Sequence, residues 1–390
     1  MDTSRFISDR AERIDASGIR RVMDLGATLK DPINLSIGQP DFDVPEAIKD
    51  AACEAVQQGK NRYTQTQGTA ELRGAIAQRL SREFPGTIGG GGAQLADGTG
   101  LLITAGVSGG LVLSLLATVG PGDEVVIPDP YFVMYKHLVT LTGATPVYVD
   151  TYPDFAVTAD RIEPALTERT KLVLFNTPSN PTGVVASQQV CKEVVELCEQ
   201  RGVLLVSDEI YDEFCYEKAE IDGGTWCPSP LHESPNALLL RGYSKTYGMT
   251  GWRLGYAAGP AAIIEQMTKI QQYSFVCAPS MVQAAGAMAL GVDMSRHVSA
   301  YERKRDRVVE RLSPHYNLSI PGGAFYAFPE VPPSLGLTAS RFVEKAIEHN
   351  LLIIPGSVFS QRDTHVRLSY ACDDAMLERG LDVLVKLVGG

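Results

Sequence analysis

Short apolar runs alternate with longer amphipathic segments through the middle of the chain. The apolar runs predict strands at 101–104, 124–128, 145–150, 171–176, 203–208, 237–243 and 254–259. Helical patterns are expected between them, near 108–119, 131–143, 158–167 and 187–201. Most of these strands are apolar at every position, which is typical of strands that helices cover on both faces. The alternation predicts an α/β fold with a mostly parallel seven-stranded sheet.

The link between the last two predicted strands is short for a parallel crossover, at about ten residues, so one of them is expected to run antiparallel. After residue 290 the pattern changes. A charged amphipathic helix at 297–312 precedes "GGAFYAFP", a helix near 338–350, "LLIIPGSVF", "HVRLSYA" and a final helix from Asp373. We therefore expect a smaller α+β domain at 291–390, a large domain at 46–290, and an N-terminal arm with the start of the small domain at 1–45.

The composition fits a soluble globular protein with a large core, since 44% of the 390 residues are hydrophobic and 21% are charged. A formal net charge of −11 with no basic tract argues against a nucleic-acid partner. No charge stands between Asp97 and Asp123, a run long enough to cross a bilayer. Glycines interrupt this run, so we expect a buried strand, a turn and a buried helix, and no membrane segment.

The cysteines and histidines suggest neither disulfides nor a metal. Seven cysteines without any C-x-x-C spacing indicate reduced thiols, and the charged N-terminus lacks the apolar core of a signal peptide, so a cytoplasmic location is expected. The six histidines have no ligand spacing, and no metal site is predicted.

Polar and aromatic residues gather where the predicted strands end. Ligands of open α/β sheets bind beyond the carboxyl ends of the strands, so these positions belong to one candidate site. The set comprises Gly106, Val107, Ser108, Phe132, Asn180, Asp208, Tyr211, Ser244 and Lys245.

The stretch "GVSGG" at 106–110 has two interpretations. It matches the G-x-S-x-G elbow of serine hydrolases, and it is also a glycine turn before a helix, which suits a phosphate. A hydrolase needs an acid and then a histidine, but no histidine after Asp208 follows a predicted strand. The phosphate interpretation is therefore favoured, with the backbone N–H groups of Gly106, Val107 and Ser108 as donors.

Lys245 lies in "SKTYGMTGWRLG", directly after a buried strand, where an amine becomes nucleophilic toward a carbonyl. Arg253, eight residues later, supplies a fixed positive charge to a phosphate. A lysine and a phosphate cup together suggest pyridoxal phosphate. Asp208 then suits the pyridine nitrogen and Phe132 the face of the ring, while Asn180 and Tyr211 suit its phenolic oxygen.

These residues stand in motifs that occur together in one family. The chain resembles the pyridoxal-phosphate-dependent aminotransferases of the aspartate aminotransferase superfamily (fold type I, class I/II) from about Asn34 to the C-terminus. The resemblance rests on "LSIGQPDF", "YTQTQGTAELR", "DPYF", "PSNPTG", "SDEIY", "SKTYGMTGWRLGY", "GGAFY", "PGSVF" and "HVRLSYA", in family order.

The resemblance implies roles for individual residues. Lys245 is similar to the Schiff-base lysine that moves the proton, with Asp208 and Tyr211 as further catalytic residues, and Ser108, Ser244 and Arg253 beside the phosphate. Tyr63 resembles the tyrosine that reaches the phosphate across a homodimer interface. Arg367 resembles the arginine that binds the substrate carboxylate, with Gly38 and Asn180 next to it. The resemblance also implies cis peptides at Asn180–Pro181 and Asp129–Pro130.

The chain departs from relatives at three positions. Gly242 replaces a phosphate-binding serine, Phe132 replaces a tryptophan or tyrosine, and Ser108 stands where some aspartate-specific relatives carry a lysine. The last difference weakens the case for aspartate as the best substrate.

The expected function is ping-pong transfer of an amino group from an L-amino acid to a 2-oxo acid, such as 2-oxoglutarate or pyruvate. A carbon–sulfur β-lyase with the same cofactor is the alternative, and a non-catalytic binding module is a third class.

Overall fold

The computed structural model describes residues 1–15, 18, 22, 24, 26, 29–92 and 94–389. Its largest sheet has seven strands in the order β2-β10-β9-β6-β5-β3-β4. Their bounds are β2 Thr99–Thr104, β3 Glu124–Asp129, β4 Thr145–Asp150, β5 Thr170–Asn176, β6 Leu204–Asp208, β9 Leu238–Gly242 and β10 Gly255–Pro260. β10 runs antiparallel to both neighbours and the other pairs are parallel, so the predicted mostly parallel seven-stranded sheet is confirmed.

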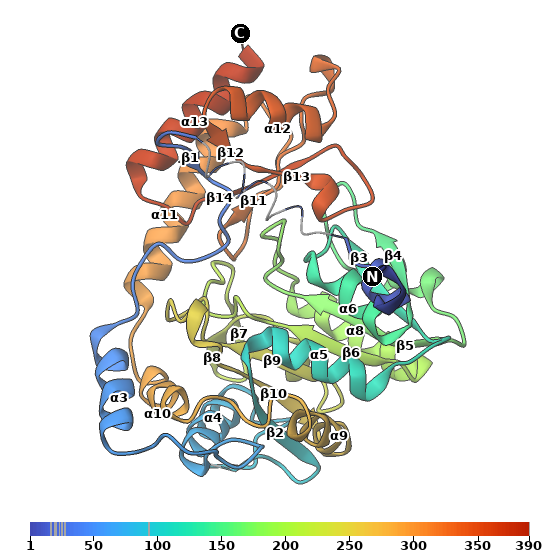
Figure 1. Ribbon diagram of the computed structural model, residues 1–390, viewed down its shortest axis with the longest axis vertical. Coiled ribbons are helices and arrows are strands. Elements are labelled where there is room, and N and C mark those ends of the chain that lie inside the picture. Colours follow the sequence, from blue (N-terminus) through green and yellow to red (C-terminus); the bar gives the residue numbers. More distant parts are fainter. Residues whose placement is uncertain are drawn as a thin grey trace.

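Helices cover both faces of this sheet (Figure 1). One face packs against α5 (Gly106–Thr118), α6 (Met134–Thr142) and α9 (Ala261–Gln272). The other packs against α4 (Ala70–Glu83), α8 (Gln188–Arg201) and α10 (Ser280–Ala289), and α3 (Glu46–Gln57) lies against α10. Adjacent residues of β2 serve different layers, since Leu102 belongs to the first core and Ile103 to the second. This double covering explains why the strands are apolar at every position.

The apolar run that follows Asp97 forms β2 and α5, as predicted. No helix in the described part of the chain has both the length and the apolar character that a membrane crossing requires.

A second group of elements lies above the sheet in Figure 1. It contains α11 (Ser295–Leu312), α12 (Ala339–Glu348) and α13 (Asp374–Gly389), with a small antiparallel sheet of β11 (Tyr326–Ala327), β14 (Val366–Ser369) and β13 (Ile354–Pro355). β1 (Ile33–Asn34) pairs in parallel with β12 (Leu351–Leu352), and Ile33 and Leu35 join the core of this group. The domain boundaries at 45 and 290 stay a prediction.

Some elements differ from the prediction. The helix expected at 158–167 is a short α7 (Ala159–Ile162) that tightens into a 3₁₀ turn at Glu163–Ala165, where Pro164 lacks the N–H of a continuing helix. The helix expected at 131–143 begins only at Met134. A hairpin of β7 (Ala219–Ile221) and β8 (Gly224–Trp226) and the short α1 (Asp9–Glu12) were not predicted. The two X-Pro bonds expected to be cis, at 129–130 and 180–181, are cis.

Candidate active site

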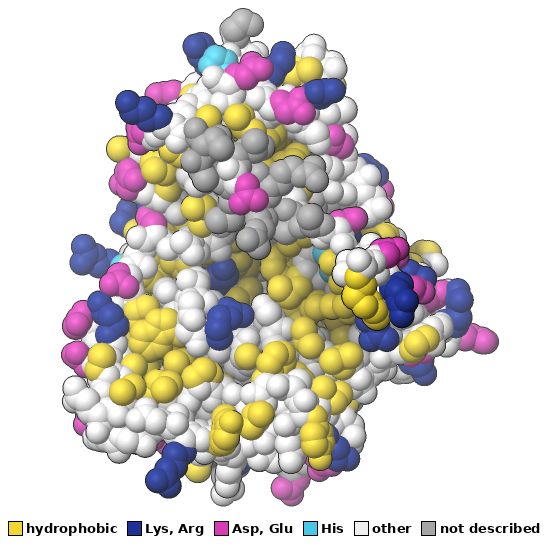
Figure 2. Space-filling model, in the orientation of Figure 1, with side chains coloured by type: hydrophobic (Ala, Val, Ile, Leu, Met, Phe, Trp, Pro, Cys, Tyr) yellow, Lys and Arg dark blue, Asp and Glu magenta, His cyan; other side chains and the backbone are white. Residues whose placement is uncertain are grey.

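A cavity of about 280 Å³ lies at the carboxyl ends of the large sheet, where most of the predicted site residues meet. Its lining includes Gly38, Val107, Ser108, Phe132, Asn180, Asp208, Tyr211, Ser244, Lys245, Arg253 and Arg367. Figure 2 shows a hollow between the sheet and the elements above it, with basic side chains set among hydrophobic ones. The fold therefore brings together residues that are as much as 329 positions apart in the sequence, namely Gly38 and Arg367.

Lys245 follows β9 and extends into this cavity. Its Nζ donates a hydrogen bond to the carbonyl of Gly38 at 2.6 Å. The pKa of Lys245 is lowered to about 8. Burial is the largest cause, the positive charges of Arg367 and Arg253 also lower this pKa, and the smaller effect of Asp208 raises it. About a tenth of this amine is therefore neutral at pH 7, far more than for an ordinary lysine, and the neutral form is the one that acts as a nucleophile or a base.

Asp208 is the last residue of β6 and is only 3% exposed. Its Oδ2 accepts a hydrogen bond from the hydroxyl of Tyr135 at 2.7 Å, and its Oδ1 accepts one from the N–H of Ile210 at 3.3 Å. Burial raises the pKa of Asp208 to about 6, although the bond from Tyr135 lowers it. A buried carboxylate of this kind gains strongly from a cation placed beside it.

The start of α5 forms a cradle next to Arg253. Gly106 has φ +71°, and a Cβ there would lie 2.7 Å from Nη2 of Arg253, so glycine alone fits without displacing the guanidinium. The first N–H groups of a helix point away from it and favour an anion. Arg253 donates only to the carbonyls of Thr250 and Ala105, and no carboxylate of the described chain pairs with it. Ser108 and the buried Ser244 also line this end.

Arg367 lies on β14 and is 1% exposed. Its Nη1 donates to Oδ1 of Asn180 at 3.1 Å and its Nη2 to the carbonyl of Ser36 at 2.9 Å. Its Nε is buried without a partner in the described structure. The guanidinium stacks over the rings of Tyr326 and Phe359, each 4.5 Å away, and forms no ion pair with a carboxylate of the described residues. Such a held arginine suits a carboxylate ligand.

Tyr211 closes the cavity between Asp208 and Arg367. Its hydroxyl shares a hydrogen bond of 2.9 Å with that of Tyr326, and burial raises the pKa of Tyr211 well above its ordinary value. The phenol is therefore protonated at neutral pH and is able to donate. No histidine lines the cavity within the described residues, so the partner that a Ser108 nucleophile needs is missing from it.

The family model for aminotransferase class I and II matches residues 30–384. The chain belongs to the class I and II aminotransferases. It is 34% identical to aromatic-amino-acid aminotransferase 2 of Thermococcus litoralis and 34% identical to the aspartate aminotransferase of Pyrococcus abyssi, with 98% of both chains covered in each comparison. The aspartate aminotransferase of Thermus thermophilus, solved with maleate, superimposes with a TM-score of 0.88 at 32% identity, over 98% of this chain and 99% of that one. The protein is thus a pyridoxal-phosphate-dependent enzyme of amino-group transfer.

The residues of this aminotransferase fit the cofactor. The absence of a Cβ at Gly106 lets the Arg253 guanidinium lie against the start of α5, and no carboxylate of the described residues pairs with Arg253. Burial disfavours the charged form of Asp208, and the positive charge of a pyridinium beside it would stabilise that form. Lys245 lies in the same cavity and is the one lysine of its described lining.

Two predicted residues fall outside the cavity lining of the aminotransferase. Gly106 lies next to it, with its space facing Arg253. Tyr63 is 84% exposed and lines a separate surface pocket together with Arg62 and Thr64, so within one subunit it does not reach the cavity around Lys245.

Sequence reasoning missed several contacts in the site. Tyr135 holds Asp208, Tyr326 holds Tyr211, and Asn176 donates to the carbonyl of Asp208 at 2.8 Å while its Oδ1 accepts from the N–H of Asn180 at 2.9 Å. Asn176 and Tyr326 stood within quoted strand ends and motifs, but no spacing in the sequence predicted their partners.

Proposed function

We propose that this aminotransferase takes the amino group of an L-amino acid and passes it to a 2-oxo acid in the cavity around Lys245. The observation that carries this proposal is the meeting of Lys245 and Arg367 in one cavity. The amine of Lys245, with a pKa of about 8, acts as a base at the reacting carbon. The buried guanidinium of Arg367 binds the carboxylate that every α-amino acid and every 2-oxo acid has.

The chemistry that bound pyridoxal phosphate supplies is withdrawal of electrons from the bonds at the substrate Cα. Asp208 keeps a proton on the pyridine nitrogen, because its own burial favours a cationic neighbour. Tyr211 and Asn180 donate hydrogen bonds to the phenolic oxygen. The N–H groups of Gly106, Val107 and Ser108 bind the phosphate with the side chains of Ser108, Ser244 and Arg253, and Phe132 covers the ring.

Lys245 carries the proton. With the cofactor bound, its amine would take the proton from the substrate Cα and deliver it two atoms away, on the far side of the amino nitrogen, in a 1,3-proton transfer. A pKa of about 8 leaves both forms of the amine populated for this task. The carbonyl of Gly38 accepts a hydrogen bond from this amine and limits its movement. Arg367 fixes the other end of the substrate, and Asn180 holds the guanidinium in place.

The described lining supports a donor with an uncharged side chain. Its three cations are Lys245, Arg253 and Arg367, and each has a role above. Among the relatives, one is named for aromatic amino acids and others for aspartate, so the family accommodates both kinds. Comparison of kcat/KM for tyrosine, methionine and aspartate with 2-oxoglutarate tests this. A clear preference for aspartate would contradict it.

A homodimer with shared sites completes the proposal. Tyr63 and a neighbouring segment expose large apolar side chains, namely Tyr63, Tyr273, Phe275 and Val276. The side chain of Gln271 links these segments by donating to the carbonyl of Thr66 at 2.7 Å. Exposed apolar side chains on two linked segments support an interface there. The cytoplasmic location keeps its support from seven cysteines that are all free.

A single-turnover experiment separates transfer from the lyase alternative. An amino acid mixed with the loaded enzyme, without any oxo acid, is expected to yield one 2-oxo acid per active site and no ammonia. Addition of 2-oxoglutarate or pyruvate then makes the reaction continuous. Continuous release of pyruvate and ammonia from a cysteine conjugate, with no acceptor present, would favour the β-lyase.

A further inference from the structure

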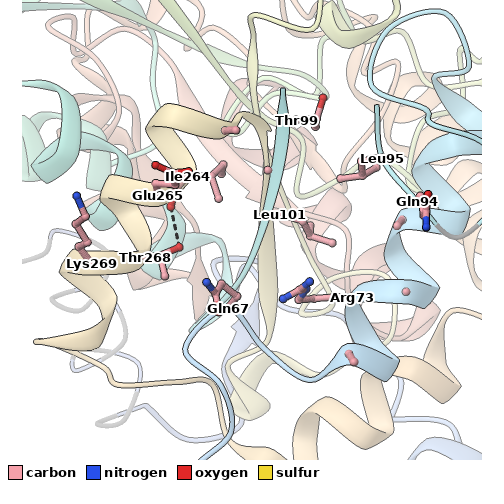
Figure 3. A pocket seen from close by; sticks show the side chains of 15 residues that line it. Gln67, Arg73, Gln94, Leu95, Thr99, Leu101, Ile264, Glu265, Thr268 and Lys269 are labelled. Carbon is pink, nitrogen blue, oxygen red and sulfur yellow. Dashed lines mark hydrogen bonds between the residues drawn. The ribbon is translucent and has the colours of Figure 1, made fainter. Parts of the chain in front are cut away.

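A second cavity, of about 770 Å³, lies at the edge of the large sheet (Figure 3). β2 forms its floor, α9 and α4 form its two walls, and Gln94 and Leu95 contribute from the loop before β2. It shares no lining residue with the cavity around Lys245.

The floor of this second cavity is an open strand edge. Within the residues that the structure describes, β2 is an outer strand and pairs with β10 alone. Its outer edge is closed at one end, where Ile103 N–H donates to the carbonyl of Gln67, and at the other, where Thr99 N–H donates to that of Ala96, both at 3.0 Å. Alternate residues of an antiparallel strand point their N–H and C=O groups to the same side, so those of Leu101 also face outward. No described residue forms a hydrogen bond with either group.

Small residues line part of both walls beside this edge, namely Ala70, Gly74 and Ala77 on α4 and Ala261 on α9. We call the space between the two walls the slot. A Cβ added at Gly74 would meet nothing within 4 Å. Successive side chains of an extended chain point to opposite faces of a sheet, so small residues in the walls leave room for those of a guest strand.

The end of the slot beside Gln67 is positively charged. Arg73, Lys269 and Glu265 are the charged lining residues. Arg73 is half-buried, and its guanidinium forms neither an ion pair nor a hydrogen bond with any described residue. In Figure 3 this guanidinium points toward Gln67. Lys269 donates only to the side-chain oxygen of Gln266, at 3.2 Å. A guest carboxylate at this end would therefore meet a free guanidinium.

We propose that this slot binds the C-terminal end of an extended polypeptide, parallel to β2. The last residue of the guest donates its N–H to the carbonyl of Leu101, and the carbonyl two residues earlier accepts from the N–H of Leu101. The free carboxylate then lies at Arg73. Because Gln67 already occupies the next position on the edge, a chain end fits and a continuing chain does not.

Acetyl-trialanine with a free carboxylate is the probe, added to the loaded enzyme. The same peptide with a C-terminal amide and the shorter N-acetylalanine serve for comparison. Hydrogen–deuterium exchange is expected to slow in the segment 99–103. The acid should bind about tenfold or more tightly than the amide, since a hydrogen bond to a charged group contributes about that much. It should also bind more tightly than N-acetylalanine, which lacks the carbonyl that accepts the hydrogen bond from the N–H of Leu101.

Two variants locate the probe. Arg73→Gln is expected to remove the preference for the acid over the amide. Gly74→Leu fills the slot and abolishes binding, and leucine is a better helix former than glycine, so α4 is not put at risk. Arg82→Gln, an exposed arginine of the same helix outside the cavity, is the matched control and should change nothing.

Several results would overturn the proposal. These are absence of binding at millimolar probe, equal affinity for acid and amide, and N-acetylalanine binding as tightly as the tripeptide. Protection confined to the segment around Arg367, or binding that survives Gly74→Leu, would equally contradict it. None of these results bears on amino-group transfer.

Discussion

Asp208 is a carboxyl group that the fold buries with a tyrosine and a backbone N–H as hydrogen-bond partners. Its pKa of about 6 lies above the unfolded value of 3.8, so its effect on stability has a definite sign. Below pH 3.8 the group is protonated in both states and carries no penalty. As the pH rises toward 6, the unfolded chain ionises first, and the cofactor-free protein loses stability.

We therefore predict that Asp208→Asn stabilises the cofactor-free protein at pH 7 by up to about 3 kcal/mol, and has little effect at pH 3.5. The same change should weaken cofactor binding and activity strongly. Urea unfolding at both pH values measures the first effect, with the exposed Asp97→Asn as control. A variant that is less stable than the parent at pH 7 would show that a stabilising interaction of the carboxylate was lost.

Arg367 is the residue whose loss should affect all substrates alike. Removal of one buried partner of a hydrogen-bonded charge pair costs roughly 2–5 kcal/mol, so Arg367→Ala should lower kcat/KM at least about thirtyfold for every amino acid. Arg362→Ala, which removes an exposed arginine paired with Asp150, should leave kcat/KM near the parent value. A loss restricted to one amino acid would mean that Arg367 binds a side chain instead.

Residue types at strand ends predicted most of this site, because each role needs one kind of side chain. Lys245 and Asp208 follow from such reasoning, whereas Arg367 lies within β14 and was predicted only by the resemblance of its motif to the family. The partners that hold them do not, since Tyr135 is 73 residues from Asp208 and Tyr326 is 115 from Tyr211. These pairs come together only in the folded protein, and no periodic pattern in the sequence predicts such contacts.

At the scale of elements, the turn between β2 and α5 decides whether a phosphate fits. Gly106 holds a left-handed φ of +71°, and the space of a Cβ is taken by the Arg253 guanidinium. We predict that Gly106→Ala lowers stability by about 1–2 kcal/mol, the cost of that conformation for other residues, and also weakens cofactor affinity. Gly120→Ala, beyond the far end of α5 with open space around it, should leave cofactor affinity unchanged.

Urea unfolding and a fluorescence titration with pyridoxal phosphate measure these two effects. If Gly106→Ala bound the cofactor as tightly as the parent, the cradle at α5 would not be the phosphate site.

The strands of the large sheet were predictable because both of their faces are buried, which makes them apolar throughout. The small-sheet strands β11 and β13 have two residues each, too few to show any period. The β7–β8 hairpin is partly or fully exposed at every position, so its residues carry no apolar signal. In this protein the sequence pattern therefore predicts the strands whose faces are buried, and it does not predict strands that are short or exposed.

At the scale of the whole molecule, the exposed Tyr63 suggests that a site is complete only in a dimer. Loss of one hydrogen bond to the phosphate costs about 1.5–3 kcal/mol, or roughly ten- to a hundredfold in cofactor affinity. Lys245→Ala subunits mixed with subunits that carry an inactivating Tyr63→Glu change should regain activity, since each heterodimer contains one intact site. If heterodimers form without any activity, Tyr63 acts within its own subunit or not at all.

We propose that Lys245 binds the cofactor covalently, in the cavity that it shares with Asp208 and Arg367. Borohydride reduction of the purified, loaded protein fixes the cofactor to the amine that holds it. Digestion and mass spectrometry then identify that amine. We predict a pyridoxyl group on the peptide that contains Lys245 and on no other peptide. A pyridoxyl group on a different lysine would contradict the assignment of the whole site.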